Sequence, residues 1–219
     1  MGMLKLVCPL SEEKMSDVKD KISNPTTTGL GLGFSFQDST YRVRGDVMGK
    51  MTFPNGKEEI VLDKKNVYTL DGGILAAMLF SGETGVGPVN KLAVGTGYSG
   101  DQNSPDLADN RQRSLRIELE RKTFSSVVYR NADGTESSVP TNVVDLTTVF
   151  NETEAIGGLV EMGLIATQTD TPNPNAFPTN SRDTTVNLTS FDVLVNYLTF
   201  PVINKPSGAV LALTWRLTF

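Results

Sequence analysis

Residues 196–219 constrain the fold of this chain more than any other stretch, because apolar and polar side chains alternate on both sides of a turn. The segment from Asn196 has the sequence NYLTFPVINKPSGAVLALTWRLTF and ends on Phe219. Alternation with a period of two residues is typical of β-strands. A chain end that alternates in this way would fray unless it were paired. We therefore predict that this stretch forms two strands and that the C-terminus is built into a sheet.

Much of the remaining chain shows the same pattern of short strand-like runs between turn signals. The 20 glycines and 11 prolines supply those turns. In residues 114–130 we expect Leu115, Ile117 and Leu119 on one face, and Arg116, Glu118 and Glu120 on the other. Asn131-Ala-Asp133-Gly134 predicts the turn that follows. Strands are predicted over 91–94, 114–130, 141–150, 159–166, 186–200 and 209–219.

A β-hairpin is predicted over residues 41–66. Asn55-Gly56 lies between two strand-like runs, and this dipeptide favours a two-residue turn in which both residues have positive φ. A helix is predicted over residues 70–81, with Asp71 as a possible cap. Its buried face would carry Ile74, Leu75, Met78 and Leu79.

These elements predict a mainly β protein, an antiparallel sandwich of two sheets with about eight strands and one short helix. The domain would span residues 41–219. Residues 1–40 are predicted to form an extended N-terminal arm that orders against a neighbouring subunit, or else a simple linker or disordered tail. Asn24-Pro25 and the glycines that follow break any regular element there, while residues 11–23 could form a short polar helix. Residues 167–183 are predicted to form a long irregular loop that is functional or merely mobile.

The composition excludes several classes of function. The net charge is −5, and direct nucleic-acid binding is not expected because phosphate contacts need clustered lysines and arginines. The nearest basic group is interleaved with glutamates and is interpreted as a solvated strand face; it comprises Arg111, Arg113, Arg116, Arg121 and Lys122. Cys8 is the single cysteine, so no intramolecular disulfide can form. The chain has no histidine, which rules out a Ser–His–Asp triad, a Cys–His dyad and His-ligated zinc.

The N-terminus does not resemble a signal peptide, because its brief apolar run meets Pro9 and then a charged stretch. The longest apolar run, residues 73–80, is far shorter than the ~20 residues of a membrane-spanning helix. We therefore expect a soluble protein.

One glycine motif tests the idea of a nucleotide cofactor. Gly95, Gly97 and Gly100 match G-x-G-x-x-G after an apolar strand. A dinucleotide site needs a long helix that opens at the third glycine. Here Ser104 and Pro105 could start only a helix of about two turns over residues 107–112. We interpret the motif as a tight glycine turn at a strand end and predict no cofactor.

Two groups of acidic residues are candidate sites. Asp101, Asn103, Asp106 and Asp109 could hold calcium through oxygen ligands, although turn and cap roles explain them equally well. Glu152, Glu154 and Glu161 are the nearest grouping of carboxylates for acid–base chemistry. No aromatic platform for a sugar stands near them in the sequence. Enzyme activity is therefore not predicted.

Three stretches together resemble a group of bacteriophage virion structural proteins of the tail, collar or fibre-associated β-sandwich type. The first is the helix at Leu70 followed by Leu92-Ala-Val-Gly-Thr-Gly97, and the second is Leu107-Ala-Asp-Asn-Arg111. The third is Ile156-Gly-Gly-Leu-Val-Glu-Met-Gly-Leu164, similar to G-x-I-x-E-x-G-L-F, although Ile165 replaces the final Phe. It is closed by a segment similar to F-P-x-I-x-K, ending at Lys205, and by the terminal strand with Trp215. The resemblance covers roughly residues 41–219.

The resemblance implies a structural role without catalysis, in contact with copies of itself and with other tail, neck or fibre subunits, in a virion made in the host cytoplasm. We expect a homo-oligomer in a ring or trimer. A capsid decoration protein and, in another class, a carbohydrate-binding module that uses residues 167–183 remain alternatives. Glu161 is predicted to be partly buried and to hold a backbone amide or an arginine across the sandwich. The residues assigned structural roles are Gly95, Gly97, Glu161, Gly163, Lys205 and Trp215.

Overall fold

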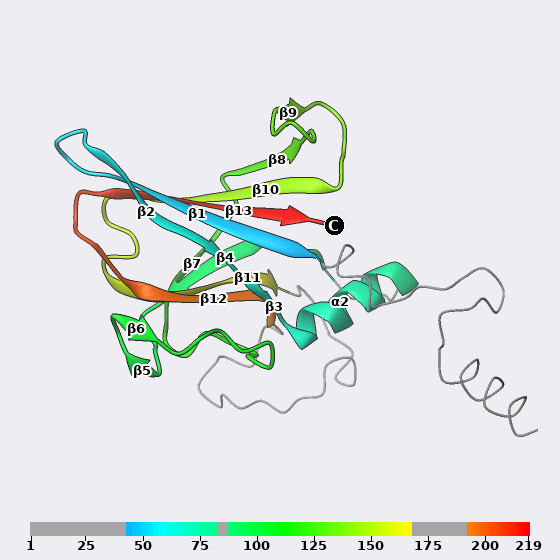
Figure 1. The fold of residues 1–219 in the computed structure, drawn as a ribbon, viewed down its shortest axis with the longest axis horizontal. Coiled ribbons are helices and arrows are strands. Elements are labelled where there is room, and N and C mark those ends of the chain that lie inside the picture. Colours follow the sequence, from blue (N-terminus) through cyan, green and yellow to red (C-terminus); the bar gives the residue numbers. More distant parts are fainter. Residues whose placement is uncertain (1–42, 83–86, 168–191) are drawn as a thin grey trace, which may run out of the picture. The chain divides into compact units, whose positions relative to one another are not determined.

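The computed structural model describes residues 43–82, 87–167 and 192–219, and a compact unit spans Val43–Phe219. Two antiparallel sheets form its layers (Figure 1). The predicted arm, the polar helix at 11–23 and the loop after Thr167 lie outside the described residues, as do residues 186–191 of one predicted strand.

The first sheet has six strands in the order β2-β1-β13-β10-β8-β9. Its strands are β1 (Arg44–Thr52), β2 (Glu58–Lys65), β8 (Ser126–Arg130), β9 (Glu136–Ser137), β10 (Val143–Phe150) and β13 (Val210–Thr218). The C-terminal strand lies inside this sheet between β1 and β10, which confirms that the end of the chain is paired.

The second sheet has five strands in the order β3-β12-β11-β4-β7. Its strands are β3 (Val67–Tyr68), β4 (Lys91–Gly95), β7 (Glu118–Thr123), β11 (Gly157–Thr167) and β12 (Asp192–Lys205). A separate two-stranded ribbon pairs β5 (Gly100–Asp101) with β6 (Ser104–Pro105). The predicted mainly β antiparallel fold is confirmed. The described residues hold thirteen strands rather than about eight, because four of them have only two residues.

The hydrophobic core lies between the two sheets and takes side chains from both. Trp215 of β13 and Phe150 of β10 are fully buried, and Phe200 of β12 meets the same cluster from the other sheet. Inward residues alternate with outward ones along β13, as its sequence predicts. Full burial of one large apolar side chain contributes about 1.5–3 kcal/mol before entropy is counted. This shared cluster is what makes the two sheets a sandwich.

The hairpin of β1 and β2 is confirmed, but its turn is not the predicted two-residue type. Thr52 pairs with Glu58, so five residues separate the strands. The Gly56 amide donates to the Phe53 carbonyl at 2.9 Å, and Gly56 is left-handed with φ 78° while Asn55 is not. Pro54 in the second turn position favours this turn, because its fixed φ suits that position.

The helix α2 (Leu70–Ser81) has the predicted bounds, with Gly82 in the left-handed conformation after it. Its cap is Thr69, whose hydroxyl accepts from the Gly72 amide at 2.9 Å, and not Asp71. The predicted buried face was partly wrong, since Leu75 is buried but Leu79 is 45% exposed. The reason is that the helix approaches β12 at Gly72, where an added Cβ would lie 2.7 Å from the Val195 carbonyl oxygen.

Residues 114–130 are not one alternating strand. They form β7 at the edge of the second sheet and β8 in the first, and the chain changes sheets between them. Leu115 is buried, but Ile117 and Leu119, which were predicted to share its face, are 60% and 43% exposed. The backbone amides of residues 116 and 117 instead donate to the buried carboxylate of Glu161, and these bonds fix the course of the segment.

Strand β12 continues past Phe200 to Lys205, although Pro201 lies within it. Its register with β11 shifts between Leu159 and Glu161, opposite this proline. Proline is tolerated at such bulges and on unpaired edges, because no ladder hydrogen bond is lost there. Next to it, the Val202 amide donates outward to the Gln102 carbonyl at 3.0 Å, so the segment around β5 and β6 covers this part of the edge.

Candidate functional site

The most densely bonded side chain of the second sheet is Glu161 of β11, which is fully buried. Its Oε1 accepts from the amides of Gly97 at 3.1 Å and Ile117 at 2.9 Å. Its Oε2 accepts from the Arg116 amide at 2.9 Å and from the Tyr197 hydroxyl at 2.7 Å. Four donors thus meet one carboxylate, and we call these five residues the carboxylate cradle. Hydrogen bonds to a charged acceptor are the stronger kind.

Glycines make room for this carboxylate. A Cβ added to Gly95 would lie 2.6 Å from Glu161 Oε1, and one added to Gly97 would lie 2.5 Å from the Ile117 nitrogen. On β11 itself, a Cβ on Gly163 would come within 2.9 Å of the Asn196 carbonyl oxygen, which cannot move aside as a side chain can. All three distances are shorter than real side-chain contacts, so these positions need glycine for close approach.

Tyr197 closes the cradle from β12. Its side chain is 1% exposed, and burial raises the pKa of its hydroxyl, with the Glu161 charge and hydrogen bond adding to the effect. The phenol therefore stays protonated and donates at neutral pH. Because each carboxylate oxygen has two partners and the side chain is fully buried, the cradle is a structural joint that holds the segments just after β4 and just before β7 against β11 and β12.

The prediction for Glu161 is partly confirmed. It does hold backbone amides, but it is completely buried, and its partners come from its own side of the sandwich rather than from across it. Tyr197 was missed as a partner, because a tyrosine in an apolar strand shows no sign in the sequence of which acceptor its hydroxyl meets.

The glycine motif at Gly95 forms a strand end and a turn. Gly95 ends β4, and Gly100, with φ 81°, begins the short ribbon. The short helix considered over residues 107–112 does not form, because Ser104 and Pro105 belong to β6 and the segment that follows has a turn at residues 110–111 but no regular secondary structure. The Thr199 hydroxyl donates to the Asp106 carbonyl at 2.8 Å and holds that segment against β12.

The acidic residues considered for calcium make local turn bonds. Asp101 accepts from the Asn103 amide at 3.1 Å, and Asp109 accepts from the Arg111 amide at 2.9 Å. Asp106 lies beside Gly100, where an added Cβ would meet its carboxylate at 3.1 Å. Across residues 43–82, 87–167 and 192–219, no three His, Cys, Asp or Glu side chains gather in a way that could hold a metal ion.

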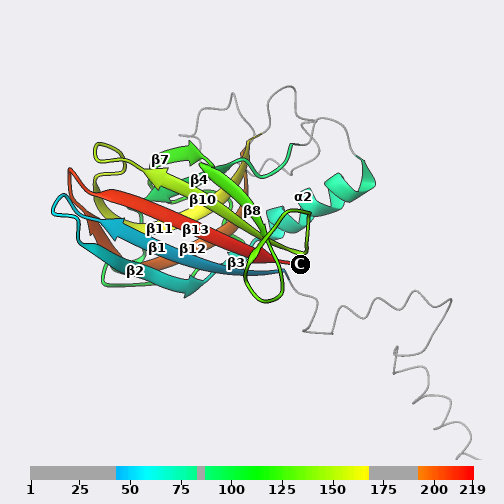
Figure 2. The same ribbon diagram turned by 90° about the horizontal axis from the view of Figure 1, so that it is seen from above.

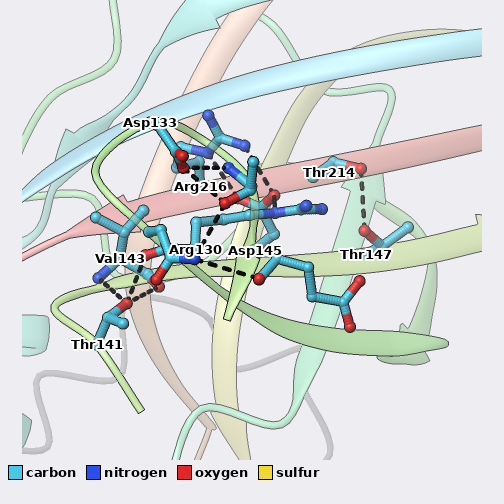
Figure 3. Close-up of polar contacts among 11 residues, drawn as sticks. Arg130, Asp133, Thr141, Val143, Asp145, Thr147, Thr214 and Arg216 are labelled. Atoms are coloured by element: carbon cyan, nitrogen blue, oxygen red, sulfur yellow. Dashed lines mark hydrogen bonds and ion pairs between the residues drawn. The ribbon is translucent and has the colours of Figure 1, made fainter. Parts of the chain in front are cut away.

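A second buried carboxylate lies on the outward-facing side of the first sheet. Asp145 of β10 is 3% exposed, although its neighbours Leu146 and Phe150 point inward. Arg216 of β13 binds it in a two-pronged way at 2.7 and 2.9 Å, and the Nε of Arg130 donates to it at 2.8 Å (Figure 3). Burial raises the pKa of Asp145, but hydrogen bonds and charges from both arginines outweigh it, so the pKa lies below its ordinary value.

This outer cluster was not predicted. Arg216 and Asp145 are far apart in the sequence and become neighbours only through the pairing of β10 with β13. One row further along the same strands, the hydroxyls of Thr147 and Thr214 are 3.0 Å apart (Figure 3). The alternation of the two strands predicts which side chains share a face, but not the register that brings these pairs together.

The third polar cluster lies at the turn between β10 and β11. Lys205 is 1% exposed and its Nζ donates to the Asn151 carbonyl at 2.8 Å; burial lowers its pKa, against the charges of nearby glutamates. Glu154 binds Lys122 at 2.5 Å and the Asn151 amide at 2.7 Å, and these contacts lower its pKa. Glu154 and Glu161 therefore serve separate networks, and the candidate carboxylates do not form a pair that shares partners.

Three of the five basic residues in 111–122 bind acidic partners. Arg113 binds Asp71 of α2 at 3.0 Å, and Arg121 bridges Glu118 and Asp192. Arg113, Arg121 and Lys122 therefore form ion pairs, whereas the sequence predicted that this basic group would be a solvated strand face.

A shallow hollow of about 400 Å³ lies at the tip of the β1–β2 hairpin, lined by Phe53, Pro54, Asn55, Lys57 and Glu59. It holds no cluster of catalytic side chains. No helix in the described residues has the length and apolarity needed to cross a bilayer. Neither the models of known protein families nor the curated proteins include a match to this chain.

Proposed function

We propose that this protein is a non-enzymatic structural subunit of a bacteriophage virion, acting in the neck, collar or tail or as an adaptor that anchors fibres. The carboxylate cradle is the observation that carries the proposal. Gly95, Gly97, Glu161 and Gly163 belong to the stretches that resemble the virion proteins, and all four are used for internal packing and hydrogen bonding.

The other two residues assigned structural roles support the same reading. Trp215 is fully buried between the sheets, and Lys205 is buried against the Asn151 carbonyl. The stretches that carry the resemblance therefore supply joints of the sandwich, and the most conspicuous carboxylate is saturated by donors. A protein whose distinctive residues serve its own fold is suited to assembly, and among the described residues the two edge strands of its first sheet, β2 and β9, each have one unpaired edge.

The test is to locate the chain in a particle. Phage particles induced from a strain that carries the gene would be purified and probed with gold-labelled antibodies against the chain. We expect the protein to copurify with particles and the gold to lie at the neck, collar or tail. Absence of the protein from intact particles would overturn the proposal.

The same images separate the alternatives. Label distributed over the shell would favour a capsid decoration protein. Binding of the isolated protein to a glycan array, without label on particles, would favour the carbohydrate-binding module. The partners proposed for the chain are copies of itself and neighbouring virion subunits.

A further inference from the structure

The edge strand β2 carries a charge pattern that complements itself. Its sequence is Glu58-Glu-Ile-Val-Leu-Asp-Lys-Lys65, with two acids at one end and two lysines at the other. Among the described residues β2 has one neighbouring strand, β1, so its other edge is unpaired (Figure 2). Unpaired edges are templates for another strand.

We propose that this edge binds the β2 strand of a second copy of the chain in antiparallel orientation, about a two-fold axis between Val61 and Leu62. This register places Glu58 opposite Lys65 and Glu59 opposite Lys64 of the other copy, twice each by symmetry. Opposite charges directly across an antiparallel pair are stabilising, and like charges there are destabilising. Two six-stranded sheets would join into one continuous sheet.

A bulge in β2 makes this register possible. In a regular strand, residues 58 and 65 would point to opposite faces, because side chains alternate. The register with β1 shifts between Gly49 and Lys50, which inserts Val61 as an extra residue in β2. As a result Glu58 and Lys65 both lie opposite outward residues of β1, while Glu59 and Lys64 both lie opposite inward ones. The paired charges therefore share a face.

The side chains of this edge are accessible. Ile60 is 60% exposed, and Asp63, Lys64 and Lys65 are exposed. Glu58 binds Lys50 at 2.8 Å and Glu59 binds Lys57, but both glutamates remain well exposed, at 55% and 41%. Exposed ion pairs of this kind are weak, so they compete little with a partner strand.

The alternative is that the charges and the bulge protect the edge from aggregation, as they do in many monomers. Protection requires charge alone, whereas pairing requires charge of opposite sign at matching positions. The proposal goes beyond the structural role given above and stands independently of it, because it depends only on β2. It also differs from the expected ring or trimer, since a two-fold contact closes as a dimer.

The test is a charge swap, read out by sedimentation equilibrium of the full chain at up to about 0.1 mM. The variants Glu58→Lys/Glu59→Lys and Lys64→Glu/Lys65→Glu each oppose like charges and are expected to weaken dimerisation by roughly tenfold or more. Mixing the two variants, or combining all four changes in one chain, is expected to restore the dimer. Glu136→Lys/Glu152→Lys is the matched control for the first variant, because it makes the same change in net charge at exposed sites away from β2.

Backbone amide exchange locates the contact, since amides of β2 are expected to exchange more slowly in the wild type than in either reversal variant. A monomeric wild type at the highest concentration would overturn the proposal. So would an assembly whose mass is the same in both reversal variants, or one that the control weakens as much as they do.

Discussion

Two buried carboxylates in this molecule are satisfied in opposite ways. Glu161 of the second sheet accepts from three backbone amides and a tyrosine hydroxyl, whereas Asp145 of the first sheet is bound by two arginine side chains. Amides of the main chain cannot turn away when their acceptor is lost, but arginines on an outer face can reach water. We infer that Glu161 determines the path of the backbone. Asp145 instead adds side-chain bonds between strands that are already paired through their backbone hydrogen bonds.

The largest expected effect is the loss of Glu161. We expect Glu161→Ala to lower the free energy of unfolding by about 4 kcal/mol, because several buried donors lose a charged acceptor. Urea unfolding followed by tryptophan fluorescence of Trp215 measures it. Asp145→Ala is the matched comparison and is expected to lose about half as much. An Asp145→Ala loss equal to or larger than that of Glu161→Ala would break the comparison between the two sites.

A substitution at Gly97 tests whether the backbone must approach Glu161 closely. We expect Gly97→Ala to cost about 3 kcal/mol, because its Cβ would overlap the Ile117 nitrogen and Glu161. Gly73→Ala is the control: nothing lies within 4 Å of its Cβ, and alanine in a helix is more stable than glycine by about 1 kcal/mol. Thermal unfolding should move in opposite directions for the two variants, and a shift in the same direction would contradict the close approach at Gly97.

Asp145→Asn separates charge from shape at the outer cluster. The amide keeps the size of the side chain but removes the charge that both arginines bind, so we expect a loss of about 1.5 kcal/mol at pH 7. Urea unfolding measures this value. Adding salt should reduce the difference between wild type and variant, because both arginines are partly exposed. A difference that does not change with salt would mean that packing, rather than charge, dominates.

Lowering the pH is expected to have the smallest effect on stability, and the direction of that effect follows from the shifted pKa of Asp145. The pKa of Asp145 is lower in the folded protein than in the unfolded chain, so its contribution is present above about pH 4 and is lost as pH falls through the folded value. The gap in stability between wild type and Asp145→Asn should therefore shrink from neutral pH to about pH 3. Unfolding curves at a series of pH values check this, and a gap that widens with acid would contradict the sign.

The sequence predicted what depends on local pattern. The helix bounds were predicted correctly because the apolar spacing lies within the segment and Gly82 follows it directly, and the hairpin followed from the turn residues around Gly56. The cap at Thr69 was missed, although a threonine before the first helical residue is a recognisable signal.

The site depended on contacts that no local pattern contains. Glu161 meets Gly97 across 64 residues and Tyr197 across 36, so the cradle exists only once four strands have paired. Ile117 illustrates this, because alternation predicted it on the same face as Leu115, but Leu115 is buried while Ile117 is exposed and its amide is held by the carboxylate. Tertiary hydrogen bonding outweighed the local preference at that position.

Amide hydrogen exchange at Gly97, Arg116 and Ile117 tests most directly whether Glu161 is the joint of the second sheet. In the wild type these three amides should be protected nearly as strongly as the core of β11, since all donate to one buried carboxylate. In Glu161→Gln, which keeps the shape but places an amide group among donors, all three should lose protection together while β13 keeps it. Unchanged protection of the three amides in that variant would contradict the account.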